Sequence, residues 1–119
     1  MANIFAWALF ALGVAHVAFG LVRFKKPLTA AVSAGFIDRF SQPEDRRTAF
    51  WFLIFGPPVM LAGQVAVHAV ATGDVWLLRV IGWYVFAIAV AGIAAFPKSP
   101  FWGALVVAPA LIAAGYGWL

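Results

Sequence analysis

The chain of 119 residues is 66% hydrophobic and 10% charged, and its eight basic and four acidic residues give a net charge of +4. Soluble domains carry about 25% charged residues, so this composition predicts one integral membrane domain over residues 1–119 rather than a soluble enzyme. The basic excess is then expected to report orientation in the membrane, and no nucleic-acid partner is expected. The absence of cysteine excludes disulfides, thiol catalysis and cysteine-ligated zinc.

Four apolar runs predict four membrane spans. They cover residues 4–22, 50–71, 75–96 and 101–119. At about 1.5 Å per residue each run is roughly 28–33 Å long, which matches the hydrocarbon core of a bilayer. Runs of this length in lipid must be helical to satisfy their own backbone hydrogen bonds. We therefore expect an all-α, integral membrane four-helix bundle.

The segment between the first two spans, residues 23–47, holds most of the charge. Within it, Pro27 is suited to start a helix, and apolar side chains recur every four residues at Leu28, Val32, Phe36 and Phe40. This pattern predicts a short amphipathic helix on the inner leaflet. The helix could anchor the chain to lipid or dock a partner. Six of the eight basic residues lie in this segment: Arg23, Lys25, Lys26, Arg39, Arg46 and Arg47.

The basic residues also predict the orientation of the spans. Positive charge is retained on the cytoplasmic side, so loop 23–47 and the link 97–100, which contains Lys98, should be cytoplasmic. Both termini should then be periplasmic. Tryptophans favour membrane interfaces, and their positions agree with this topology: Trp7, Trp76 and Trp118 at the outer boundary, Trp51 and Trp102 at the inner one.

Few polar side chains lie within the spans, and such residues are costly there unless they are paired or functional. No Asp or Glu is predicted at mid-membrane, which argues against proton-coupled carriers and carboxylate-bridged metal centres, and no metal site is expected. The polar residues that need an explanation are His16, Gln64, His68, Arg79 and Tyr84.

His16 lies in the inner half of the first span, at the depth of Pro57 and Pro58 in the second. A proline has no backbone N–H, so these two deprive the carbonyls of Leu53 and Ile54 of their helical donors. We expect His16 to donate a hydrogen bond to one of these carbonyls and so join the two helices.

A second interpretation of His16 is ligand or cofactor binding, with haem or another tetrapyrrole held by this single histidine. His68 should lie about 20 Å away in depth, by the rise per residue. The two histidines are therefore not expected to ligate one haem iron within a single chain.

The remaining polar residues are expected together in the outer half of the molecule. The short link 72–74 predicts that spans two and three form an antiparallel hairpin, which brings His68 to the level of Arg79 and Gln64 to that of Tyr84. Such a cluster could bind an anionic or carbonyl-bearing amphiphile, with Arg79 as the charge anchor and His68 as donor or base. The alternative is structural: Arg79 reaches the interface and pairs with Asp74, while Gln64 and His68 hydrogen-bond each other or span three.

Several motifs resemble those of a known family. They are GVAHVAFG at 13–20, FKKPL at 24–28 and AFWFLIFG at 49–56. In these the chain resembles a family of small four-span bacterial membrane proteins of unknown function. The resemblance implies four helices in a bacterial inner membrane, and it implies no activity.

The sequence favours a non-catalytic small membrane protein, either an accessory subunit of a larger membrane complex or a homo-oligomeric bundle in the lipid bilayer. The main alternative is a lipophilic-ligand or cofactor binder, or an isomerase or cyclase acting on a lipid-like substrate through Gln64, His68, Arg79 and Tyr84. A third alternative is a small carrier or channel, although the band between His16 and the outer cluster is apolar.

Overall fold

The computed structural model describes residues 2–97 and 101–118, and this part of the chain contains five α-helices and no β-strand. The expected all-α fold is confirmed. By length and composition α1, α3 and α4 can each cross a membrane, while α5 is a shorter apolar helix of 15 residues. The helices are α1 (Ala2–Arg23), α2 (Lys25–Ser33), α3 (Glu44–Thr72), α4 (Val75–Ala95) and α5 (Phe101–Gly115).

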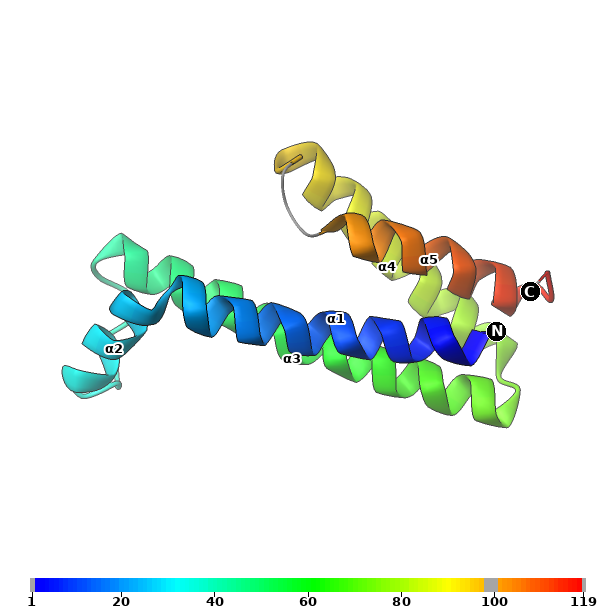
Figure 1. The fold of residues 1–119 in the computed structure, drawn as a ribbon, viewed down its shortest axis with the longest axis horizontal. Helices are drawn as coiled ribbons and strands as arrows, with labels where there is room; N and C mark the ends of the chain where they lie inside the picture. The colour runs from blue at the N-terminus through cyan, green and yellow to red at the C-terminus, as the bar shows by residue number, and fades with distance from the viewer. Residues whose placement is uncertain (1, 98–100, 119) are drawn as a thin grey trace.

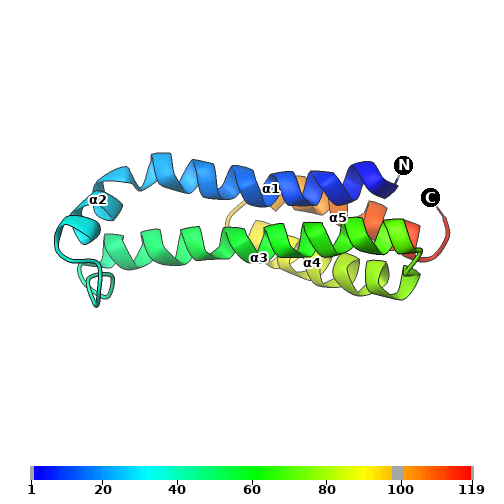
Figure 2. The same cartoon turned by 90° about the horizontal axis from the view of Figure 1, so that it is seen from below.

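The long helices form two antiparallel pairs, α1 with α3 and α4 with α5 (Figures 1 and 2). Glycines permit the close approach within each pair. A Cβ on Gly63 of α3 would lie 2.5 Å from Cα of Phe10 in α1, and one on Gly82 of α4 would lie 2.9 Å from the backbone nitrogen of Ile112 in α5. Because no larger residue fits there, backbone packs directly on backbone, as is common between membrane helices.

α3 is the longest helix, with 29 residues. It begins at Glu44, six residues before the predicted apolar run, and places Glu44 and Asp45 in its first turn, where the helix dipole favours carboxylates. The helix continues through Pro57 and Pro58.

The link between α3 and α4 is as tight as predicted. Gly73 has φ of +71°, which favours glycine at the end of a helix. The Asp74 carboxylate accepts a hydrogen bond from the backbone nitrogen of Leu77 at 3.1 Å and so caps α4. Beyond the link, however, α4 leaves α3 and runs along α5 (Figure 1). The expected hairpin of spans two and three is therefore splayed, because α4 packs closely on α5.

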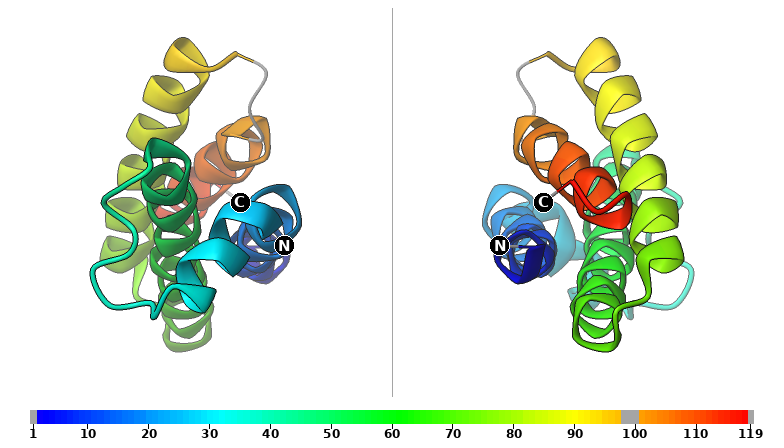
Figure 3. Two further views of the ribbon diagram at one scale, coloured as in Figure 1. Left: turned by 90° about the vertical axis from the view of Figure 1, so that its left-hand side faces the viewer. Right: turned by 90° about the vertical axis from the view of Figure 1, so that its right-hand side faces the viewer.

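The buried core lies where the two pairs meet, close to the two termini (Figures 1 and 3). From there α4 diverges from α1 and α3 toward its own C-terminal end. The core consists mainly of small and branched side chains from all four long helices: Ala6, Leu9, Ala66, Ala69, Leu78, Ile81, Val107, Leu111 and Ala114.

The loop between α1 and α3 contains the predicted short helix, but the helix is shorter than its apolar stripe. α2 ends at Ser33, and Gly35 and Phe36 follow with φ of +116° and +67°. These left-handed conformations end the helix. Phe36 and Phe40 therefore lie in the following loop, where the Phe40 ring packs between Phe36 and Phe50, at centroid distances of 5.2 and 5.5 Å.

Candidate functional site

His16 connects α1 to α3. Its Nε2 lies 2.6 Å from the backbone oxygen of Phe52, and its ring stacks on the Phe52 ring with centroids 4.0 Å apart. The expected hydrogen bond to α3 is present, but the acceptor is Phe52 rather than Leu53 or Ile54. Phe52 lies one turn before Gly56 on the face of α3 that packs on α1, whereas Ile54 is exposed.

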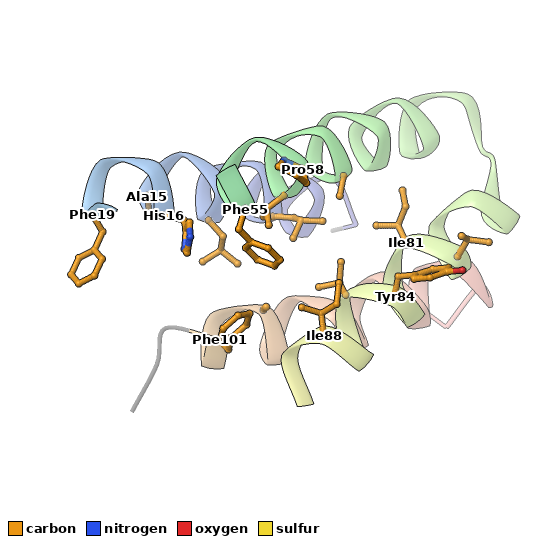
Figure 4. A pocket seen from close by; sticks show the side chains of 16 residues that line it. Ala15, His16, Phe19, Phe55, Pro58, Ile81, Tyr84, Ile88 and Phe101 are labelled. Atoms are coloured by element: carbon orange, nitrogen blue, oxygen red, sulfur yellow. The ribbon is translucent and has the colours of Figure 1, made fainter. Parts of the chain in front are cut away.

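A pocket of about 710 Å³ lies between the α1–α3 pair and the α4–α5 pair (Figure 4). This size falls within the range of small-molecule sites in proteins, roughly 300–1,000 Å³. The pocket is partly open, and α1, α3, α4 and α5 all contribute to its lining: Leu9, Leu12, Ala15, His16, Phe19, Phe55, Pro58, Val59, Ala62, Val80, Ile81, Tyr84, Val85, Ile88, Phe101 and Ala104.

His16 and Tyr84 are the two polar side chains in this lining. Figure 4 places His16 and Phe19 toward one end of the pocket and Tyr84 toward the other. Tyr84 is 70% exposed, and its hydroxyl makes no hydrogen bond within the described part of the chain. The pocket is therefore an apolar slot with one polar side chain toward each end.

The predicted outer cluster does not converge on this pocket. Gln64 and His68 are exposed on α3, beside the glycine-bearing face that packs on α1. The carbonyl of His68 accepts a hydrogen bond from the Thr72 hydroxyl at 2.9 Å, and no hydrogen bond joins Gln64 or the His68 ring to another described residue. Of the five predicted site residues, only His16 and Tyr84 line the pocket.

Arg79 packs against α5. Its guanidinium carbon lies 5.1 Å from the centre of the Tyr116 ring, within the range of a cation–π contact. Its Nε donates to the carbonyl of Val75 at 3.3 Å, and its side chain contacts Gly115, where a Cβ would collide with it. The pairing with Asp74 considered from the sequence is replaced by these contacts, because the Asp74 carboxylate caps α4.

Binding of a cofactor through Nε2 of His16 would compete with the hydrogen bond that this atom already makes. Nε2 is engaged by the Phe52 carbonyl, so a haem or other tetrapyrrole held through Nε2 would have to break the α1–α3 hydrogen bond. Among residues 2–97 and 101–118, no group of three or more His, Asp or Glu side chains is placed to hold a metal ion.

Most of the pocket residues carry no recognisable signal in the sequence. Leu12, Val85 and Ile88 are ordinary apolar residues of membrane helices, which can face lipid, another helix or a pocket equally well. Only His16 and Tyr84 stood out, as polar groups within apolar runs. The divergence of the two helix pairs creates the pocket, and it depends on packing between distant segments.

The chain belongs to a family of unknown function, DUF6463, whose profile matches residues 1–118. The sequence resemblance to a family of unknown function is confirmed at this level. No curated protein and no solved structure matches the chain. The geometry of the pocket is consequently the main guide to function.

Proposed function

We propose that this protein is a non-catalytic membrane protein that binds a lipophilic small molecule in the pocket between its two helix pairs. The observation that carries the proposal is the apolar pocket of about 710 Å³ lined by α1, α3, α4 and α5. Ligand sites are typically concave, mostly apolar and equipped with a few polar groups that orient the ligand. This pocket has that composition.

The packing around the pocket supports a persistent cavity. Phe55 and Phe101 meet across the two pairs with ring centroids 6.0 Å apart, and Gly103 of α5 lies against Leu12 of α1. These contacts set the spacing between the two helix pairs, and the side chains between the pairs leave a cavity unfilled. Unfilled apolar space forfeits dispersion contacts, so an apolar occupant would stabilise the arrangement.

The lining favours binding over catalysis. Acid–base chemistry needs a donor and an acceptor positioned on the same reacting group, whereas His16 and Tyr84 lie toward opposite ends of the pocket. Gln64, His68 and Arg79 do not line it. The described geometry therefore lends no support to an isomerase or cyclase that uses these residues together.

The proposal includes a membrane orientation. The α1, α3, α4 and α5 helices cross a bacterial inner membrane, with residues 23–47 cytoplasmic and both termini periplasmic. The support is the positive-inside rule applied to the six basic residues of that segment. Trp51 and Trp76 add to it, because both are 64% exposed and lie near opposite boundaries of the membrane in this topology.

Native mass spectrometry of the protein released from its own membranes in a mild detergent tests the proposal. We expect a bound small molecule of definite mass. Ala15→Phe should displace it by filling the pocket, and Ala18→Phe is the matched control because Ala18 is also exposed on α1 but does not line the pocket. A bare protein, or a molecule retained by Ala15→Phe, would overturn the proposal. A ligand-free oligomer or a fixed complex with other chains would favour the accessory-subunit alternative.

A further inference from the structure

The hydrogen bond of His16 determines which polar atom the pocket offers to a ligand. A backbone carbonyl can only accept hydrogen bonds, so the Nε2 that lies 2.6 Å from the Phe52 oxygen must carry the proton. The residues that line the pocket around the ring include no carboxylate. A neutral imidazole has a single ring proton, and Nδ1 is therefore left with a lone pair that can only accept.

This Nδ1 lone pair has no partner within residues 2–97 and 101–118. His16 makes no hydrogen bond within the described residues other than the one to Phe52. The same residues contain no fully buried side-chain nitrogen or oxygen without a partner. Since His16 is half-buried and its Nδ1 makes no hydrogen bond there, this atom keeps accessible surface, and the residue lines the pocket.

We propose that the ligand of this pocket is a lipophilic alcohol or phenol whose hydroxyl donates a hydrogen bond to Nδ1 of His16. This inference rests on the proposed function and names the ligand class. Ethers, esters and quinones present acceptor-only oxygens to this nitrogen and cannot pair with it. A charged amine could donate, but its burial in an apolar slot is costly. The apolar remainder of the ligand extends along the slot toward Tyr84.

The test compares two probes that differ in one donor, farnesol and its methyl ether. Their binding to the purified protein in detergent is measured by native mass spectrometry, with Ala15→Phe as the reference for uptake outside the pocket. One hydrogen bond contributes a net free energy of about 0.5–1.5 kcal/mol. The wild type should therefore bind farnesol with an affinity about two- to tenfold higher than that for its methyl ether.

Two substitutions separate the ligand contact from the helix contact. The amide nitrogen of His16→Gln can take the place of Nε2 and keep the bond to Phe52, but it leaves no acceptor at the place of Nδ1. This variant loses the ring stacking on Phe52 but keeps the hydrogen bond, so it should melt above His16→Asn and bind both probes equally. His16→Asn offers its amide oxygen near the place of Nδ1 and loses the bond to Phe52, so it should melt lower and still prefer the alcohol.

The outcomes distinguish the two proposals. Equal binding of both probes by the wild type overturns the hydroxyl inference alone and leaves lipophilic binding standing. A preference for the alcohol that persists unchanged in His16→Gln also overturns the inference. If the wild type takes up neither probe beyond the level of Ala15→Phe, the proposed function falls and the inference falls with it.

Discussion

Arg79 illustrates how a charged residue in a membrane helix can serve packing. The guanidinium contacts the face of Tyr116, and Gly115 leaves space for the side chain to lie against α5. A cation–π contact contributes about 0.5–2 kcal/mol depending on how far it is desolvated. Arg79 therefore stabilises the packing of the end of α5 on the start of α4, and it does not line the pocket.

Arg79→Ala should lower the stability of the α4–α5 pair by about 1 kcal/mol, because the cation–π contact is lost. Thermal unfolding in detergent would show this as a drop of a few degrees in Tm. Tyr116→Phe, which keeps the ring, should be close to neutral, whereas Tyr116→Leu should resemble Arg79→Ala. The pocket ligand should remain bound in all three variants. Loss of the ligand from a well-folded Arg79→Ala protein would instead support the cluster predicted from the sequence.

At the scale of the helices, glycine positions decide which elements pair. Gly63 lets α3 contact the backbone of α1 at Phe10, and Gly82 lets α4 contact the backbone of α5 at Ile112. Close backbone approach increases van der Waals packing, which drives association where lipid removes the hydrophobic effect between helices. Each pair is therefore packed backbone against backbone, and the pocket lies between the two pairs.

Gly63→Ala should destabilise the α1–α3 pair by about 1–3 kcal/mol, because the added Cβ would lie 2.5 Å from Cα of Phe10 and would push the helices apart. Gly103→Ala is the matched control. Its Cβ would lie 2.9 Å from the flexible end of Leu12, and alanine raises helix propensity by up to about 1 kcal/mol. Melting curves of the two variants test this contrast, and equal Tm changes would contradict direct backbone packing at Gly63.

At the scale of the whole molecule, the charges collect at one end. The segment of residues 23–47, with six of the eight basic residues, joins the ends of α1 and α3 that lie farthest from the two termini (Figure 2). The opposite end holds the link between α3 and α4 and both termini. This asymmetry is the basis for the proposed orientation.

Single cysteines can test the orientation, because the natural chain has none. Ser33→Cys and Thr72→Cys are a matched pair, since both replace an exposed hydroxyl residue at the end of a helix. A membrane-impermeant maleimide added to intact cells should label Thr72→Cys and should reach Ser33→Cys only after permeabilisation. The reverse pattern would invert the topology. Labelling of both in intact cells would contradict a membrane crossing between them.

The candidate site was only partly predictable from the sequence. His16 and Tyr84 could be identified because a polar group within an apolar helix needs a reason to be there. The acceptor of the His16 hydrogen bond was misassigned to the carbonyls freed by Pro57 and Pro58. Loss of a helical donor identifies an available acceptor, but the rotation of α3 against α1 decides which carbonyl faces His16, and that rotation depends on Gly56 and Gly63.

The sequence by itself determined the helical class, the long apolar elements, the tight turn at Gly73 and the concentration of positive charge in one loop. These properties depend on composition and short-range backbone geometry, because a chain in lipid must satisfy its hydrogen bonds within each segment. Only the tertiary structure decided that α4 leaves α3 to pack on α5, that Arg79 contacts Tyr116 and that a pocket separates the two pairs. These features depend on which small-residue faces meet, and several faces of similar composition compete along every apolar helix.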